Sequence, residues 1–189
     1  SKKIFEGLKN KFSIAESYLG LGLYYSFGNE MDLDNAKNNF EQALKIYEAL
    51  NSKEGLSRAF FMLGTYYQSK GEFDEAILYF TKSMNICIEL ENKFSEGLAY
   101  NSLASSYLEK REFGNAQFYY EKSLKLNEII KNKVGYKNDL YSLASLYLRQ
   151  LRYDEALRYL NILVERAKEE KDDRNQVLGL RWVASTYSG

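Results

Sequence analysis

A block of residues recurs along the chain with a period of 40, and this repeat constrains the fold more than any other feature. Residues 63–76 are repeated as 103–116 and again as 143–156 without a gap. An earlier copy at 21–36 is two residues longer in its turn, and a last copy begins at residue 183. A fixed period of roughly 20 to 50 residues marks architectures of stacked units, so the chain is predicted to be one array.

The apolar residues within each unit have the spacing of a helix. In one unit Ala76, Phe80, Met84 and Ile88 follow each other at intervals of four, which places them on one helical face. The sequence contains no proline, and because proline breaks helices, its absence suits a chain that is helical nearly throughout.

Each unit is predicted to contain two helices, a first helix and a second helix. Gly28 and Gly71 are expected to end first helices, because glycine adopts the positive φ found at many helix ends. Asp34, Asp74 and Asp154 favour the start of second helices. First helices are expected over residues 14–27, 55–70, 96–110, 136–150 and 175–188, and second helices over 33–50, 73–91, 113–131 and 153–171.

Several residue types stand at fixed offsets in every unit: a small residue, a tyrosine, an alanine, and a ring or leucine. One unit has Gly64, Tyr67, Ala76 and Phe80, and the next two have Ala104, Tyr107, Ala116 and Tyr120, then Ala144, Tyr147, Ala156 and Leu160. These positions resemble the tetratricopeptide repeat (TPR). The resemblance implies an all-α fold, a right-handed α-solenoid of antiparallel helix pairs called a TPR superhelix. A unit of 40 residues without the helix-ending proline predicts longer helices than the common form of about 34 residues.

The whole chain, residues 1–189, is expected to form a single TPR array. Residues 8–13 match residues 90–95, so residues 1–13 are predicted to be the end of a preceding second helix. Four repeats are then expected at 15–56, 57–96, 97–136 and 137–176, followed by a truncated first helix at 177–189. Because natural arrays usually finish with a polar capping helix, the sequence is expected to be a piece of a longer protein.

No catalytic residue, cofactor or metal is predicted. The sequence has no histidine, which removes the usual general base and the commonest metal ligand. Gly20 and Gly22 lack the Lys and Ser/Thr of a phosphate-binding loop, and the acidic turn at 29–34 lacks the central Gly of a calcium loop. Cys87 falls where a buried small residue is expected. The chain is therefore expected not to be an enzyme.

Charge and hydropathy restrict the partners. The 26 Lys and Arg residues balance the 26 Asp and Glu residues, and nucleic-acid and membrane-surface binders usually carry a basic excess, so neither partner is expected. The tyrosines fall mostly at repeat-core positions, which favours packing over base stacking. No apolar run is long enough for a membrane span, and the lone cysteine suits a reducing compartment. A cytoplasmic location is expected.

The inner surface of the array is the candidate binding site. The resemblance implies that first helices line a concave face, and offsets of three or four residues from core positions identify its lining. The predicted groove residues are Arg58, Phe61, Thr65, Gln68, Leu98, Asn101, Ser105, Asn138, Tyr141, Ser145 and Arg181. Asn101 and Asn138 suit hydrogen bonds to an extended peptide backbone, with Phe61, Leu98 and Tyr141 forming side-chain pockets.

The sequence therefore predicts a scaffold that binds a peptide or protein segment in its groove, within a larger bacterial signalling or regulatory protein. The 40-residue spacing is similar to that of bacterial cytoplasmic receptors for short signalling peptides and of arrays that precede sensor kinases. Leu19 and Leu23 occupy the places of the carboxylate clamp found in chaperone-binding repeats, so that clamp is absent. The alternative is a structural spacer or a self-association module that uses end repeats around Trp182 and has no ligand in the groove.

Overall fold

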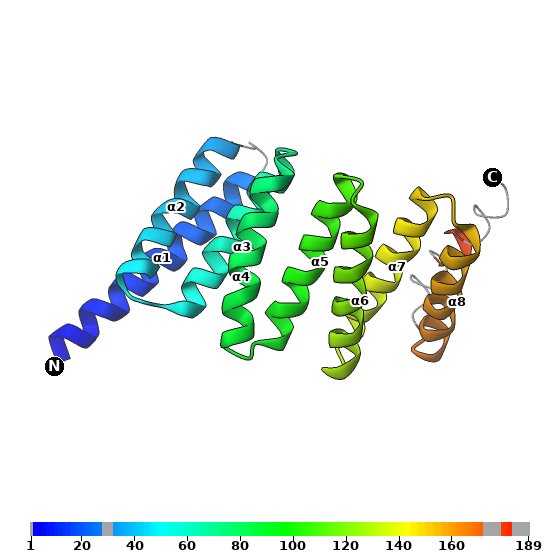
Figure 1. The fold of residues 1–189 in the computed structure, drawn as a ribbon. Helices are drawn as coiled ribbons and strands as arrows, with labels where there is room; N and C mark the ends of the chain where they lie inside the picture. Colours follow the sequence, from blue (N-terminus) through cyan, green and yellow to red (C-terminus); the bar gives the residue numbers. More distant parts are fainter. Residues whose placement is uncertain (1, 28–31, 172–178, 183–189) are drawn as a thin grey trace.

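The computed structural model describes residues 2–27, 32–171 and 179–182, and helices stacked in chain order make up the fold (Figure 1). The helices are α1 (Lys2–Phe27), α2 (Leu33–Ala49), α3 (Lys53–Ser69), α4 (Phe73–Glu89), α5 (Lys93–Glu109), α6 (Phe113–Ile129), α7 (Lys133–Arg149) and α8 (Tyr153–Glu169). Residues 179–182 are also helical. Each helix packs against the next one along the chain. The predicted all-α solenoid of antiparallel helix pairs is confirmed.

The length of the helices explains the 40-residue period. Each helix from α2 to α8 has 17 residues, and turns of three residues at 50–52, 70–72, 90–92, 110–112, 130–132 and 150–152 join them. One helix and one turn therefore take 20 residues, and a pair takes 40.

First helices begin two or three residues earlier than predicted, at Lys53, Lys93 and Lys133. The residue before each is an N-cap. The side chain of Ser52, for example, accepts a hydrogen bond from the backbone N–H of Gly55 at 3.2 Å, and Asn92 and Asn132 make the equivalent bond. Such a cap satisfies an N–H group that has no partner within the helix, so the helix starts directly after it.

The helix α1 differs more strongly from the prediction. It runs without a break from Lys2 to Phe27, where the sequence predicted the end of one helix in residues 1–13 and a new helix from residue 14. A continuous helix satisfies its own backbone N–H and C=O groups, whereas a turn would need capping partners. The predicted truncated helix at 177–189 lies largely outside the described residues.

Turns between helices contain a residue in the left-handed region of backbone space. Gly71 has φ 76°, as predicted, and Gly28 lies outside the described residues. The other turns use residues with side chains and φ between 50° and 59°: Asn51, Glu91, Arg111, Lys131, Leu151 and Lys171. The next N–H bonds back into the preceding helix, as from Arg152 N to Tyr147 O at 2.9 Å. This pattern satisfies carbonyl groups at the helix end although it strains residues with a Cβ atom.

Replacing Leu151 by glycine is expected to raise the free energy of unfolding by about 0.5–1 kcal/mol, since glycine adopts positive φ without the steric cost of a side chain. Leu151 is 71% exposed, so little burial is lost. Urea denaturation followed by circular dichroism measures the change. Leu151→Ala keeps the Cβ atom and serves as the control. A glycine variant no more stable than the alanine variant would contradict the strain at this turn.

The core of each unit is a close approach between its two helices. A Cβ atom on Gly64 would lie 2.6 Å from Cδ1 of Phe80, so only a residue without a side chain lets the buried Phe80 ring lie there. The 40-residue repeat also produces a recurring ring stack between first and second helices. Tyr67 and Tyr79 stack at 5.3 Å between ring centroids, and the pairs Tyr107–Tyr119 and Tyr147–Tyr159 repeat this stack.

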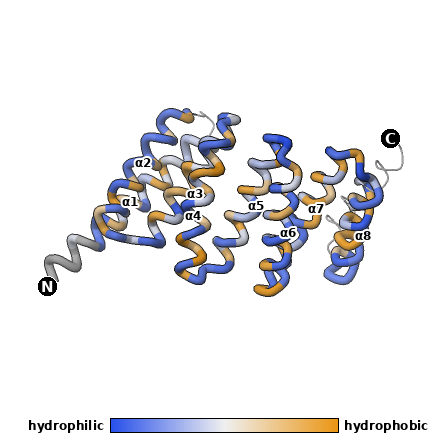
Figure 2. Tube along the Cα trace, in the orientation of Figure 1, coloured by the Kyte–Doolittle hydropathy of each residue, from blue (hydrophilic) through white to orange (hydrophobic). Residues whose placement is uncertain are grey.

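Hydrophilic and hydrophobic residues are interspersed along the helices (Figure 2). Among the described helices, none combines the length and the apolar character needed to cross a membrane. The mixture of hydrophilic and hydrophobic residues fits helices that bury one face against their neighbours in the stack.

Candidate functional site

First helices form a continuous inner layer of the stack. The helices α1 and α3, α3 and α5, and α5 and α7 contact each other directly, in addition to the second helices between them. A stack of helix pairs curves so that the helices that approach each other most closely lie on the inner side. The surface of α3, α5 and α7 that carries the predicted groove residues is called the groove below.

Two predicted groove residues connect neighbouring first helices. Arg58 Nη1 on α3 lies 2.6 Å from Glu16 Oε1 on α1, and the hydroxyl of Tyr47 donates to the same carboxylate. Burial and Glu16 together raise the pKa of Tyr47 above its usual range, so this hydroxyl stays protonated. Gln68 Nε2 donates to Ser106 Oγ of α5 at 3.1 Å. These bonds fix the orientation of the Arg58 and Gln68 side chains in the groove.

A hollow of about 160 Å³ lies in the groove between α3 and α5. Its lining contains three predicted residues, Arg58, Phe61 and Leu98, together with Ser57, Met62, Ser83 and Ser95. Leu98 is 44% exposed and Phe61 is half-buried against Phe80, with 5.3 Å between the ring centroids. The hollow therefore has apolar walls and a guanidinium group at its rim.

Hydroxyl groups form the buried side of this hollow. Ser57 Oγ lies 3.4 Å from Ser83 Oγ and 3.1 Å from the sulfur atom of Cys87. All three residues are buried, and Cys87 is a free cysteine. The burial of Cys87 agrees with its expected packing role.

The remaining predicted residues are distributed along the groove. Thr65 bonds through its hydroxyl to Phe61 O of its own helix at 3.0 Å, and Ser105 and Ser145 are half-buried. Asn138 and Arg181 are exposed. Tyr141, 39% exposed, packs edge-to-face on Trp182 with 5.3 Å between the ring centroids. The structure thus brings one group of predicted residues to the α3–α5 hollow and places Tyr141 beside Trp182.

Asn101 takes part in a buried polar network rather than lying free in the groove. Its Nδ2 donates to Asp139 Oδ1 at 2.7 Å, and Asn127 Nδ2 donates to Asp139 Oδ2 at 2.7 Å. Asn127 Oδ1 in turn accepts from Asn132 Nδ2 at 2.8 Å. Asp139 is 1% exposed, and burial raises the pKa of its carboxyl group while the Asn127 and Asn101 amides oppose the rise.

The sequence interpretation missed Asp139, although the repeat carries a signal for it. The equivalent residues of the two preceding units, Ala59 and Ala99, are small and fully buried. An acidic residue at such a position must find hydrogen-bond donors in the interior. Asn101 and Asn127 are those donors, so a residue-by-residue comparison of units would have identified the network.

Within residues 2–27, 32–171 and 179–182, no three His, Cys, Asp or Glu side chains are grouped so that they could hold a metal ion. The polar groups of the groove are hydroxyl, amide and guanidinium groups, which bind ligands through hydrogen bonds and charge.

Models of the tetratricopeptide repeat match two stretches of the chain, residues 13–89 and 98–129. No curated protein sequence matches the chain.

Solved structures share the fold at low identity. A Signal Transduction ATPase with Numerous Domains from Pyrococcus horikoshii, which has a tetratricopeptide repeat sensor, matches 98% of the chain with a TM-score of 0.81 and 20% identity. The chain spans 30% of the length of that protein. The apo form of RapI matches 94% of the chain and 68% of its own, with a TM-score of 0.78 and 19% identity. A Rap protein complexed with Competence and Sporulation Factor matches 97% of the chain and 52% of its own, with a TM-score of 0.71 and 16% identity.

Proposed function

Because the chain belongs to the tetratricopeptide repeat family, we propose that it is a non-enzymatic interaction scaffold that holds an extended peptide or partner segment in its groove. The observation that carries this proposal is the α3–α5 hollow. Three residues chosen from the repeat pattern alone, Arg58, Phe61 and Leu98, come together around it. A pocket with apolar walls and one charged rim group suits a side chain of an extended segment.

The volume and chemistry of the hollow specify what it would hold. About 160 Å³ accommodates one medium-sized apolar side chain and no folded element. Arg58, already paired with Glu16, presents a guanidinium fork with further N–H donors to a backbone carbonyl or an acidic group beside that side chain. The exposed Asn138 and Tyr141 on α7 extend the same surface and offer further backbone and side-chain contacts.

The proposal also covers the kind of larger protein of which this chain would be a part. A Rap protein of similar fold has been solved complexed with Competence and Sporulation Factor, and a signal-transduction ATPase of similar fold carries its repeats as a sensor within a longer chain. These likenesses support a role as the recognition part of a larger signalling protein. From the 40-residue spacing and the lone cysteine we further propose that this protein is bacterial and cytoplasmic.

A substitution in the groove tests the proposal. Linear peptides selected from a random display library against the wild-type chain serve as the probe. Leu98→Glu is expected to weaken their binding about tenfold or more, because a carboxylate would replace an apolar wall of the hollow. Isothermal titration calorimetry measures the dissociation constants.

Leu78→Glu on α4 is the matched control, since Leu78 is 53% exposed and is not part of the hollow. Its effect is expected to stay within about twofold. Equal losses in the two variants, or no loss in Leu98→Glu, would contradict binding in the groove.

Self-association is the second candidate function, and one observation favours it. Leu21 and Tyr24 of α1 are 47% and 62% exposed, whereas the equivalent Leu63 and Tyr66 of α3 are 1% and 4% exposed in a cluster with residues of α2. An uncovered apolar helix face is suited to a helical partner. Light scattering over a concentration series distinguishes the two functions, because a strict monomer at high concentration counts against self-association.

A further inference from the structure

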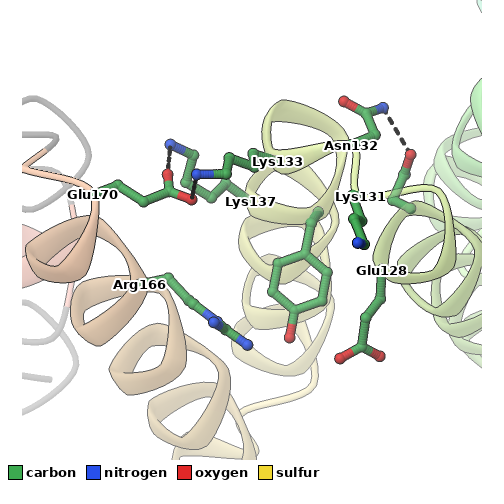
Figure 3. A pocket seen from close by; sticks show the side chains of 9 residues that line it. Glu128, Lys131, Asn132, Lys133, Lys137, Arg166 and Glu170 are labelled. Atoms are coloured by element: carbon green, nitrogen blue, oxygen red, sulfur yellow. Dashed lines mark hydrogen bonds and ion pairs between the residues drawn. The ribbon is translucent and has the colours of Figure 1, made fainter.

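A second hollow, of about 150 Å³, lies between the end of α6, the start of α7 and the end of α8 (Figure 3). Its lining consists of Asn127, Glu128, Lys131, Asn132, Lys133, Tyr136, Lys137, Arg166 and Glu170. None of these residues lines the α3–α5 hollow. We call it the α6–α8 cleft.

Basic side chains dominate this lining. Four residues carry a positive charge (Lys131, Lys133, Lys137 and Arg166) and two carry a negative charge (Glu128 and Glu170), so the lining has a net charge of 4 − 2 = +2. The whole chain, by contrast, has a net charge of zero. Positive charge gathered in a cleft attracts anions.

One carboxylate already lies between two of these ammonium groups. Lys137 Nζ lies 2.9 Å from Glu170 Oε2, and Lys133 Nζ lies 3.3 Å from Glu170 Oε1 (Figure 3). The Lys137 side chain is only 11% exposed. Lys137 and Lys133 lower the pKa of Glu170, as expected for a carboxylate between two cations. The two lysines are therefore positioned for an acidic group with two oxygen atoms.

The remaining cations, Arg166 and Lys131, line the cleft from two sides (Figure 3). Arg166 lies over the ring of Tyr136 at 5.9 Å from the centroid, which directs the guanidinium group toward the cleft (Figure 3). Arg166 also pairs with Glu169 on the exposed side of α8 at 3.3 Å. Lys131 lies in the turn that follows α6, opposite Arg166 (Figure 3). Cations thus line the cleft from opposite sides, and one of them lies over the Tyr136 ring.

Three of the charged positions replace residues without charge in the preceding unit, although Lys93 and Glu96 of that unit also form an ion pair at 2.9 Å. Residues 40 positions earlier are Gly97, Leu126 and Ile130 in place of Lys137, Arg166 and Glu170. A Cβ atom on Gly97 would lie 3.6 Å from Asn127 Oδ1 and 3.7 Å from Leu126 Cδ2, which are ordinary van der Waals contacts. Charged pairs in a half-buried seam stabilise a fold no better than apolar packing does. Stability alone therefore gives no reason for the change.

We propose that the α6–α8 cleft binds a phosphate group, carried as a dianionic monoester, between Lys137, Lys133 and Arg166. A phosphate monoester has a charge of about −1.5 to −2 at neutral pH, which matches the lining charge of +2. Its oxygen atoms accept charge-assisted hydrogen bonds from ammonium and guanidinium groups. The Tyr136 ring supports an organic group attached to the phosphate. The Glu170 carboxylate competes with the phosphate for both lysines.

Titrations with inorganic phosphate, phenyl phosphate and acetate at constant ionic strength test the proposal, with two-dimensional NMR as the readout. Wild-type protein is expected to bind both phosphates saturably, with phenyl phosphate tighter and acetate weaker. Lys137→Gln is expected to weaken phosphate binding about tenfold or more, through loss of a charge-assisted hydrogen bond. Glu170→Gln is expected to strengthen it about tenfold, because the competing carboxylate is gone.

Two further variants keep the result interpretable. Arg166→Leu introduces the residue that the preceding unit has at this position, so it should fold and yet bind phosphate weakly. Lys53→Gln is the matched control, since Lys53 is equivalent to Lys133 but lies in an exposed pair with Glu89 at 2.7 Å.

Linear, non-saturating shifts in wild-type protein would overturn the proposal. It would also fail if Lys53→Gln weakened binding as much as Lys137→Gln, or if Glu170→Gln left binding unchanged. Acetate binding as tight as phosphate would replace the phosphate assignment by a carboxylate site.

Discussion

Replacing Phe80 by alanine is expected to lower the free energy of unfolding by about 3–5 kcal/mol. The Phe80 ring is fully buried, and it packs on the backbone of Gly64 and on Phe61. Because glycine has no side chain to move into the void, the cavity left by the ring cannot close locally. Urea denaturation followed by circular dichroism measures the loss.

Two variants make this result specific. Phe118→Ala removes a ring that is 51% exposed on α6 and is expected to cost about 1 kcal/mol or less. Phe80→Leu combined with Gly64→Ala copies Leu160 and Ala144 of a later unit, and it is expected to recover much of the loss. A cost for Phe80→Ala no larger than that for Phe118→Ala would show that the Gly64–Phe80 contact does not hold the helix pair together.

Replacing Asn127 by leucine is expected to lower the free energy of unfolding by about 2–3 kcal/mol at pH 7. The variant keeps the side-chain volume but removes one of the two amide donors that support the buried Asp139 carboxylate. Asn132 also loses its acceptor at Asn127 Oδ1. A buried charge with too few donors is costly, and this cost is the main part of the loss.

The loss of stability in the Asn127→Leu variant is expected to become smaller as the pH falls. Burial raises the pKa of Asp139 above its usual value, so the folded state binds the proton more tightly than the unfolded state. Asp139 therefore opposes folding above its folded-state pKa, and stability is recovered as the pH falls through that pKa toward the unfolded value. The cost of Asn127→Leu is expected to shrink over the same range, as shown by urea denaturation at a series of pH values.

A double-mutant cycle identifies the interaction. Asp139→Ala introduces the residue found at the equivalent positions 59 and 99. Because the double variant removes both partners, Asn127→Leu with Asp139→Ala is expected to cost about 1–3 kcal/mol less than the sum of the single variants. Strictly additive costs, or a cost of Asn127→Leu that does not change with pH, would contradict the role assigned to this network.

The architecture could be predicted from the sequence because the period and the apolar spacing are properties of the whole chain. Every second helix from α2 to α8 begins at the residue predicted for it, Leu33, Phe73, Phe113 and Tyr153. The starts of first helices were predicted less well, since they depend on single capping residues such as Ser52. The continuous α1 was missed because a local sequence match does not determine whether a turn has the contacts that would support it.

The candidate site could be predicted in part for a related reason. Offsets within a repeat identify equivalent surface positions, and Arg58, Phe61 and Leu98 do meet at one hollow. The hydrogen-bond and ion-pair partners of these side chains, however, depend on positions at which one unit has a different residue from the other units. A comparison that looks only for residues shared by all units does not detect such positions. Asp139 in place of alanine accepts a hydrogen bond from the Asn101 amide, and Lys137, Arg166 and Glu170 stand where the preceding unit has the uncharged Gly97, Leu126 and Ile130. Both features follow from contacts between units.

The most direct test of the groove is photo-crosslinking to a peptide selected against the wild-type chain. The photoreactive residue p-benzoylphenylalanine is placed singly at Leu98 in the hollow or at Leu78 on α4, two positions of similar exposure. Binding in the groove predicts crosslinks from position 98, mapped by mass spectrometry to one segment of the peptide, and none above background from position 78. Crosslinking from position 78 alone, or equally from both positions, would contradict binding of the peptide in the groove.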